Sequence, residues 1–427
     1  MTTDMDTDMT IVGAGAAGLM AAIWAGRSAP GRRVVVLDGA RKPGAKILVA
    51  GGGRCNVTHE RVSERDYAGT SLPTIRNILR RFDVPATIAF FHEIGVELKR
   101  EETGKLFPTS DSARTVLTAL LQATHDAGAR IQHPRRVQTI TRQPDGFRLG
   151  GEWGHLDTHA LILATGGRSL PKSGSDGHGY TLAQSLGHTL TPRIFPALVP
   201  LTLPRDHFLC ALSGISAPAT LELWSGTNRR LHAITGDVLC AHFGLSGPAV
   251  LDMSRHYIAA TLDDPQTSLT INWLPHTTPE AFAQTLLAAG STSALACLRP
   301  WLPERLARGL CAAAAVEPTT PAAQLTRAQR KGLTARVTRL RLPITGNRGY
   351  NYAEVTAGGV PLTELDPRRM ASRVCPDLYL CGEICDVDGR IGGFNFQWAW
   401  SSGYVAGISA AQSRPATTRK SHVSNTD

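Results

Sequence analysis

Glycines and carboxylates that follow three predicted strands are the residues of this chain best suited to chemistry. The first group is Gly13-Ala14-Gly15-Ala16-Ala17-Gly18, the second is Ala164-Thr165-Gly166-Gly167, and the third is Cys381-Gly382-Glu383. Glycine-rich turns let backbone N–H groups approach phosphates, and carboxylates at strand ends accept hydrogen bonds from sugar hydroxyls. Together the three groups predict that distant parts of the chain converge on one bound dinucleotide.

The first group follows a short apolar strand and opens an amphipathic helix over 16–27. Gly13 permits the tight turn, Gly15 lets the backbone approach a pyrophosphate, and Gly18 lets helix and strand pack closely. The next apolar strand ends on Asp38, which has the spacing expected of a carboxylate that binds a ribose. This setting makes the glycine pattern far more specific than the pattern alone.

The segment 44–56, which reads GAKILVAGGGRCN, is the most unusual string in the chain. Its three consecutive glycines remove every Cβ from a backbone that must pass something closely. Lys46 and Arg54 bring cationic donors suited to phosphate, and Asn56 can donate or accept hydrogen bonds. Cys55 is either a redox-active thiol or a small residue packed against a ring. The second interpretation is preferred, because nothing in the sequence indicates a lowered pKa for this thiol.

The second and third groups end predicted strands over 158–163 and 378–380. Ligands of open α/β sheets bind at the carboxyl ends of strands, where both groups lie. Three such groups in this order are typical of proteins that bind FAD, and Glu383 is then suited to the ribityl hydroxyls of the flavin. Gly392 and Gly393 precede a further helix, whose N-terminus is suited to negative charge on a reduced flavin.

The residues predicted to bind FAD therefore come from several stretches of the chain. Val137, in a strand-like stretch over 130–141, is included with them. The full set is Gly13, Ala14, Gly15, Ala16, Ala17, Gly18, Asp38, Lys46, Gly52, Gly53, Arg54, Cys55, Asn56, Val137, Ala164, Thr165, Gly166, Gly167, Gly382, Glu383, Gly392, Gly393, Phe394 and Asn395.

Five strings resemble the bacterial HI0933-like family, a branch of the flavoproteins with two dinucleotide-binding domains. They are VVLDGARKPGAKILVAGGGRCN, LFPTSDSA, HFGLSGPA, AEVTAGGV and CGEICDVDGRIGGFNFQWAWSSGYVAG, within a resemblance that runs from about Ile11 to Gly407. Small departures are Phe394 for the commoner Tyr, Ala241 for Thr and Asp38 for Glu. The resemblance implies FAD rather than NAD at the first turn, and an inserted β-barrel and helical subdomain over the reactive face of the flavin. The family includes bile-acid dehydro-steroid reductases and aminoacetone-oxidase-like proteins, but no residue here argues for a steroid substrate.

Composition limits the class of protein. Of 427 residues, 42% are hydrophobic and 19% charged, as in ordinary globular proteins, and no apolar run of about 18 residues predicts a membrane span. The acidic, polar start lacks the features of a secretory signal, so a cytoplasmic location is expected. The eight cysteines form no CxxC pair and no His/Cys cluster has ligand spacing, so reduced thiols and no metal are expected.

The net charge of +10 has two interpretations. It could attract nucleic acid or an acidic substrate, or it could be a solvated basic surface. The 45 lysines and arginines are spread along the chain, with no basic block interleaved with aromatics. The second interpretation is preferred, so nucleic acid is not an expected partner. The oligomeric state does not follow from the sequence.

The predicted fold class is α/β, with a discontinuous Rossmann-type FAD-binding domain and an inserted β-barrel-like and helical domain. Helices are expected over 74–94 and 112–128, and short β-like segments up to about Trp273. The predicted boundaries are 1–196 and 346–411 for the FAD-binding domain, 197–345 for the insert (β-rich over 197–275, helical over 279–335) and 412–427 for a disordered tail.

The predicted function is an FAD-dependent oxidoreductase that transfers hydride between the flavin and a small organic substrate, such as an enone. The substrate is expected to bind between the two domains, near Arg100, Lys105, Phe107, His242 and 350–352. His242 could act as a general acid, although the preferred interpretation is that it satisfies backbone groups in its glycine-rich turn. Cys55 is the other weak catalytic candidate.

The electron donor and the reaction itself stay open. No second GxGxxG lies in a strand-turn-helix setting, so NADH or NADPH would either bind the inserted domain or visit the flavin transiently. One alternative is a flavin-binding protein that acts on or with RNA without small-molecule turnover. Another is a structural flavoprotein that does not turn over.

Overall fold

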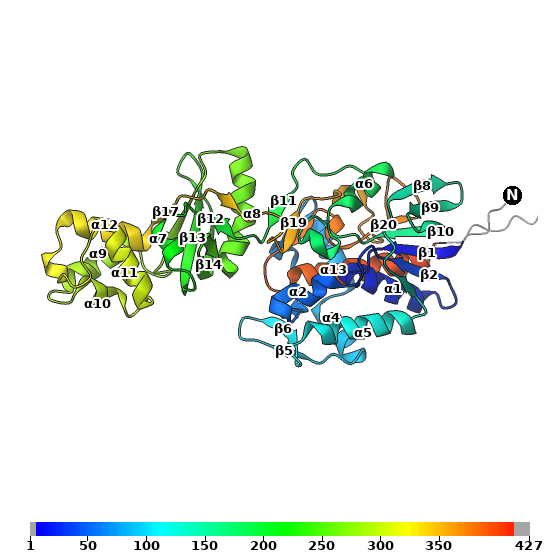
Figure 1. The fold of residues 1–427 in the computed structure, drawn as a ribbon, viewed down its shortest axis with the longest axis horizontal. Coiled ribbons are helices and arrows are strands. Elements are labelled where there is room, and N and C mark those ends of the chain that lie inside the picture. The colour runs from blue at the N-terminus through cyan, green and yellow to red at the C-terminus, as the bar shows by residue number, and fades with distance from the viewer. Residues whose placement is uncertain (1–5, 414–427) are drawn as a thin grey trace, which may run out of the picture. The chain divides into compact units, whose positions relative to one another are not determined.

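The computed structural model describes residues 6–413 and divides them into two compact units (Figure 1). One unit combines the chain up to Ile194 with the chain from Val355 onward, and the other is the insert Phe195–Glu354. The predicted disordered tail over 412–427 lies outside the described residues from position 414. The two segments of the first unit meet in a single sheet.

Five parallel strands form the centre of that sheet. β1 (Thr7–Val12) lies between β2 (Val34–Leu37) and β10 (Gly154–Leu163). β7 (Arg130–Gln132) pairs with β2 at one end, and β20 (Leu378–Leu380) pairs with β10. The middle strands are almost wholly buried, as expected of a parallel sheet covered on both faces. Their carboxyl ends bring the three predicted glycine groups to one edge.

An antiparallel hairpin, β8 (Thr139–Gln143) and β9 (Gly146–Gly151), extends β10 on its N-terminal half. The prediction of one strand-like stretch over 130–141 is therefore wrong. β7 ends at Gln132, and Pro134, which has no N–H group to donate to a ladder, lies in the connection to β8.

The first helix and the last packed helix lie against each other in this unit (Figure 1). They are α1 (Ala16–Ser28) and α13 (Phe394–Ala411). A Cβ on Gly403 would lie 2.5 Å from the backbone oxygen of Ala17, so only glycine permits this approach. This contact joins the N-terminal and C-terminal segments in addition to their pairing in the sheet.

The stretch predicted to be helical over 74–94 is helical, but it is divided into two helices by a break that the sequence did not predict. They are α3 (Leu72–Arg81) and α4 (Val84–Glu93). Asp83 caps α4, since its carboxylate accepts a hydrogen bond of 3.0 Å from the Ala86 N–H, and a proline lies in the first turn. The helix predicted over 112–128 is α5 (Ala113–Asp126).

The insert contains a seven-stranded antiparallel sheet. Its strands, in spatial order, are β17 (Leu340–Leu342), β16 (Ser268–Asn272), β13 (Ser216–Trp224), β14 (Arg230–Ala241), β15 (Gly244–Ser246), β12 (Leu201–Thr202) and β18 (Gly346–Asn347). No pairing joins β17 to β18 within residues 6–413, so the strands form an open sheet where the sequence predicts a barrel-like one. β17 and β18 are the two opposite edges of this sheet. The insert also extends past the predicted end at 345, because β18 belongs to this sheet.

Helices complete the insert. The β-like texture predicted up to Trp273 is interrupted by α8 (Pro248–Asp263), which packs on β13 and β14. Gly247 and the proline at the first helical position supply its start, a signal that the sequence analysis missed. The predicted helical stretch contains α9 (Pro279–Ala288), α10 (Ala294–Leu298), α11 (Glu304–Ala313) and α12 (Arg327–Thr338). In the described part of the chain, none of the helices has the length and apolarity that crossing a membrane requires.

Candidate cofactor site

The three predicted glycine groups meet at the carboxyl edge of the parallel sheet. A Cβ on Gly13 would lie 2.4 Å from the backbone oxygen of Ala164, so the first and second groups are in contact. A Cβ on Gly382 would lie 2.7 Å from the Cβ of Ala17, so the third group contacts the first. The convergence of segments predicted from the sequence is therefore present in the folded chain.

The glycines of the first group have different surroundings. A Cβ on Gly18 would lie 1.8 Å from the Gly13 oxygen, and Gly13 itself has φ +107°, so both positions need glycine for packing or conformation. Gly15 is the N-cap of α1, without a side-chain cap, and a Cβ there would meet no atom within 4 Å. The N-terminus of α1 thus presents open space and uncapped N–H groups, which is what a pyrophosphate requires.

Asp38 is attached to this turn. One carboxylate oxygen accepts a hydrogen bond of 2.6 Å from the Ala14 N–H, and the other accepts one of 2.7 Å from the Ala40 N–H. These bonds fix the carboxylate beside the glycine turn. Each oxygen keeps a further lone pair, so the predicted role toward a ribose stays a prediction.

The segment 44–56 begins as the helix α2 (Ala45–Gly53) and then leaves helical geometry. Gly51, Gly52 and Gly53 have φ of 58°, 68° and 85°, values that glycine adopts readily. A Cβ on Gly52 would meet no atom within 4 Å. The three glycines are therefore required by backbone conformation, and the middle one borders open space.

Cys55 is fully buried, and burial raises the pKa of its thiol to about 12. A thiol with this pKa is almost wholly protonated near neutral pH, so it lacks the thiolate character of a redox-active cysteine. Its burial agrees with the preferred interpretation of a small packed residue.

Arg54 is occupied by protein groups. Its guanidinium lies 2.6 Å from a carboxylate oxygen of Glu101, 3.5 Å from one of Asp111, and 4.0 Å from the ring centre of Phe107. These contacts do not support its predicted role toward phosphate. They also engage Phe107, a predicted substrate neighbour, while Arg100 forms an ion pair of 2.6 Å with Glu60.

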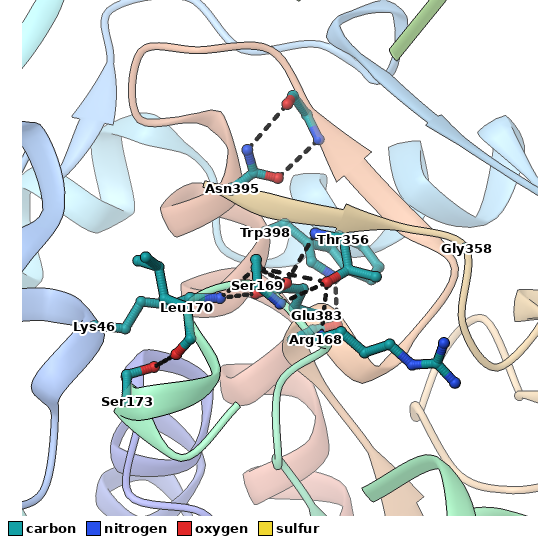
Figure 2. Close-up of polar contacts among 12 residues, drawn as sticks. Lys46, Arg168, Ser169, Leu170, Ser173, Thr356, Gly358, Glu383, Asn395 and Trp398 are labelled. Carbon is teal, nitrogen blue, oxygen red and sulfur yellow. Dashed lines mark hydrogen bonds and ion pairs between the residues drawn. The ribbon is translucent and has the colours of Figure 1, made fainter. Parts of the chain in front are cut away.

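Glu383 is the centre of a polar network that links four distant segments (Figure 2). The Lys46 ammonium lies 2.5 Å from one carboxylate oxygen and also donates to the Ser169 hydroxyl at 2.9 Å. The other carboxylate oxygen accepts bonds of 2.6 Å from the Ser169 hydroxyl and 2.9 Å from the Thr356 N–H. The Thr356 hydroxyl in turn accepts from the backbone N–H groups of Arg168 and Ser169.

This network explains two residues that the sequence analysis did not assign. Ser169 follows the second glycine group, and Thr356 lies in the quoted string AEVTAGGV, but neither has a pattern of its own. Gly167 borders the network, because a Cβ there would lie 2.5 Å from the Thr356 hydroxyl oxygen and 2.8 Å from Glu383 Oε1. The Lys46 ammonium forms an ion pair with Glu383, so it is not free to bind a phosphate.

The N-terminus of α13 begins at a pair of glycines. Gly393 is its N-cap, with φ +94° and no side-chain cap, and a Cβ there would lie 2.6 Å from the backbone of Thr58. Phe394 is buried and stacks on the ring of His59 at 5.0 Å between ring centres. The Asn395 amide is used internally, since it accepts from the Gly389 N–H and donates to its carbonyl (Figure 2).

Lys105, on β6 (Lys105–Pro108), lies beside this helix start. Its Cε would be 3.4 Å from a Cβ on Gly392. The ammonium has no hydrogen bond or ion pair within residues 6–413. An unpaired cation is thereby held next to the backbone of the Gly392-Gly393 turn.

Three buried polar atoms support the fit of a ligand. Asn56 Oδ1, Thr165 Oγ1 and Ser175 Oγ are buried with no hydrogen-bond partner within the described chain. Asn56 and Thr165 belong to the predicted cofactor stretches, and the Ser175 hydroxyl would lie 2.6 Å from a Cβ on Gly166. A buried polar atom without a hydrogen bond lowers the stability of the fold by about 1–3 kcal/mol. A polar ligand at this edge of the sheet could form hydrogen bonds with these three atoms. Val137, also predicted to contact FAD, is buried in the β7–β8 connection.

His242 lies in the insert, between β14 and β15. It is exposed, contacts the Phe243 ring edge-on at 5.0 Å, and makes no hydrogen bond within residues 6–413. The interpretation that it satisfies backbone groups of its turn is therefore wrong. Its role as a general acid stays a prediction. The described residues contain no group of three or more His, Cys, Asp or Glu side chains that could hold a metal.

A family model described as the HI0933-like protein Rossmann domain matches residues 7–409. The chain belongs to this family, as its sequence strings predict. The fold described above is the Rossmann-type FAD-binding fold, and the chain is accordingly a member of a family of FAD-dependent oxidoreductases.

Curated relatives match nearly end to end. The chain is 34% identical over 410 residues to a 3-dehydro-bile acid delta(4,6)-reductase of Clostridium scindens, covering 94% of this chain and 98% of the relative. It is also 34% identical over 401 residues to a ribosomal RNA dihydrouridine synthase of Escherichia coli K12, covering 93% and 96%. A ribosomal RNA dihydrouridine synthase of Haemophilus influenzae is 33% identical over 409 residues, covering 94% and 98%. Similar identity to differently named enzymes leaves the substrate open.

Among solved structures, a point mutant of the Escherichia coli quinol fumarate reductase subunit FrdA has a similar fold. The TM-score is 0.51 at 17% identity, over 95% of this chain and 70% of that one. This likeness extends to the fold alone.

Proposed function

We propose that the protein is an FAD-dependent reductase that delivers hydride to a carbon–carbon double bond conjugated with a carbonyl group. The observation that carries the proposal is the convergence of the three glycine groups on the uncapped N-terminus of α1. Bound FAD supplies the hydride chemistry, and the protein supplies binding and orientation.

The residues divide the work of holding the cofactor. The N–H groups at Gly15 bind the pyrophosphate, and Asp38 accepts from the adenosine ribose. Glu383 accepts from the ribityl chain, with its position and charge set by Lys46 and Ser169. The N-terminus of α13 would face the ring of a bound flavin, where its dipole would favour negative charge on the reduced form.

The names of the relatives support the class of reaction. A delta(4,6)-reductase of a 3-dehydro bile acid and a dihydrouridine synthase both reduce carbon–carbon double bonds conjugated with a carbonyl. Such a reduction adds hydride to the carbon distant from the carbonyl and a proton to the nearer carbon. Lys105, unpaired among the described residues and beside Gly392, and His242, exposed in the insert, are the proton donors we propose for test.

RNA is the second candidate substrate. The net charge of +10 and the two relatives named for ribosomal RNA favour it. The uracil ring has the same conjugated C5=C6 bond, so the hydride chemistry is unchanged and only the recognition differs. Contact with RNA also agrees with the cytoplasmic location predicted from the sequence.

Anaerobic stopped-flow measurements test the proposal directly. The purified protein is reduced by NADH, NADPH or dithionite, and the flavin absorbance is followed on mixing with enones, a uridine-containing RNA or oxygen. We expect reoxidation by at least one conjugated acceptor, with saturation in its concentration. A colourless protein that takes up no FAD, or a reduced flavin that only oxygen reoxidises, would overturn the proposal.

A further inference from the structure

An arginine of the insert lies between two aromatic rings. The Cζ atom of Arg348 is 3.7 Å from the ring centre of Tyr352 and 4.3 Å from that of Phe243. No aromatic contact joins the two rings within the described residues, so each ring contacts the guanidinium separately. The N–H groups in the plane of the guanidinium are therefore available to donate hydrogen bonds to a ligand.

Arg27 provides an internal comparison. Its guanidinium also lies over two rings, at 5.2 Å from Trp24 and 5.6 Å from Phe90, and it forms an ion pair of 2.8 Å with Glu93. Arg348 has the closer rings, but its guanidinium has no hydrogen bond or ion pair within residues 6–413. The carboxylate that completes the arrangement at Arg27 is missing from the protein at Arg348.

The backbone holds Arg348 in place without any ligand. It directly follows β18, and its N–H donates to the Pro200 carbonyl at 3.1 Å. The Phe243 carbonyl accepts from the Leu203 N–H at 3.1 Å, which fixes the second ring to the same edge of the sheet. Tyr352 is 53% exposed, so the stack lies open to solvent. Pre-positioned side chains lose less entropy when a ligand binds.

We propose that Arg348 binds a carboxylate group of the substrate, with the exposed His242 beside Phe243 as a second N–H donor. Guanidinium donors match a carboxylate in bidentate geometry, and stacking on rings restrains the plane in which they lie. The inference rests on the proposed function and narrows the substrate to an anionic conjugated carbonyl compound. In the sequence, Tyr352 lies four residues before Thr356, and the Thr356 N–H donates a hydrogen bond to Glu383.

The charge pattern favours a carboxylate over an RNA backbone. No other lysine or arginine occurs between 342 and 367, and none occurs between 231 and 254 around Phe243. Proteins that follow a nucleic-acid backbone neutralise several phosphates with several cations. A guanidinium with no other lysine or arginine near it in sequence suits one carboxylate better than a run of phosphates.

The test compares a matched pair of enones, 3-oxocyclohex-1-ene-1-carboxylate and its methyl ester, as oxidants of the reduced holoenzyme. Arg348→Met removes the donors and keeps the apolar stem, Arg348→Lys keeps the charge, and Arg27→Met is the control. We expect Arg348→Met to raise the half-saturating concentration of the acid about 10- to 100-fold, as for a charge-assisted hydrogen bond. The ester and the limiting rate should change less than about twofold, with Arg348→Lys intermediate and Arg27→Met like wild type.

The other outcomes are also decisive. Equal losses for acid and ester would assign Arg348 a structural role and overturn the inference. If neither enone reoxidises the wild-type flavin, the proposed function fails. In that case the affinity of the oxidised protein for the acid, measured by calorimetry, still tests the role of Arg348. Equal affinities of the wild type and Arg348→Met would overturn the inference. Weakened binding of a uridine-containing RNA with unchanged binding of the acid would overturn it in favour of phosphate.

Discussion

The ammonium of Lys46 lies 2.5 Å from a carboxylate oxygen of Glu383, although the two residues are 337 positions apart in sequence. Both side chains are mostly shielded from solvent, with exposed fractions of 26% and 16%. A pair of this kind holds the ends of the chain in register at the edge of the sheet. Removing one partner leaves the other charge partly buried and unpaired.

Glu383→Ala should therefore reduce both stability and flavin retention. We expect a loss of about 1–3 kcal/mol in the free energy of unfolding, below the cost of breaking a fully buried pair. The flavin-to-protein absorbance ratio after gel filtration should fall as well. Glu60→Ala, which breaks the exposed pair with Arg100, is the control and should leave the free energy of unfolding close to that of the wild type. Full flavin occupancy in Glu383→Ala would contradict the proposed role.

Gly15→Ala and Gly18→Ala should affect different properties, FAD affinity in the first variant and thermal stability in the second. Alanine at position 15 meets no protein atom within 4 Å, whereas alanine at position 18 would place its Cβ 1.8 Å from a backbone oxygen. Gly15→Ala should keep the melting temperature of the apoprotein and weaken FAD binding tenfold or more, about 1.4 kcal/mol. Gly18→Ala should lower the melting temperature itself. An unchanged FAD affinity in Gly15→Ala would show that the pyrophosphate does not bind at the N-terminus of α1.

Cys55 should be inert toward alkylation in the folded protein. Burial raises the pKa of its thiol from 9.0 to about 12, so iodoacetamide should label it slowly at pH 8 and rapidly after unfolding. The unfolded thiol ionises above pH 9 while the folded one stays protonated, so this group lowers stability as pH rises from 9 toward 12. Cys55→Ala should remove that part of the loss, about 1.4 kcal/mol per pH unit. Rapid labelling of the native protein would restore the redox interpretation.

Arg54→Met tests a residue for which sequence and structure suggest different roles. Its ion pairs with Glu101 and Asp111 are exposed, so the free energy of unfolding should stay close to that of the wild type. FAD affinity, measured by fluorescence titration of the apoprotein, should stay within about twofold of wild type. A loss of affinity beyond tenfold would show that Arg54 contacts the phosphates after all.

The sequence was sufficient for features encoded by local backbone requirements. Gly13 and Gly18 could be assigned because a tight turn and a close helix–strand contact each demand glycine, whatever surrounds them. Side-chain contacts between distant segments could not be predicted from the sequence. Lys46 was predicted to bind phosphate, because its pairing with Glu383 depends on tertiary contact, and Thr356 carried no pattern at all.

Boundaries failed where a local signal was weak. The α3–α4 break depends on one capping residue, Asp83, inside a continuous apolar pattern. The start of α8 depends on Gly247 and a proline, which also fit a turn between strands. β17 and β18 are the opposite edges of an open sheet in the insert, and whether two edge strands pair is decided by tertiary packing rather than by propensity.

Lys105→Met should make the flavin harder to reduce. The Lys105 ammonium has no partner in the described chain and its stem lies against the Gly392 position, so it adds positive charge near the N-terminus of α13. Loss of that charge disfavours an anionic reduced flavin, and a tenfold effect corresponds to a fall of about 30 mV in a two-electron midpoint potential. Spectroelectrochemical titration measures this shift without any substrate. Lys105→Arg should retain the wild-type potential. Lys99→Met, which breaks an exposed pair with Asp111, should leave the potential unchanged, because its charge is already neutralised by its partner. Equal potentials in all three variants would place Lys105 away from the flavin and leave His242 as the proton donor to test.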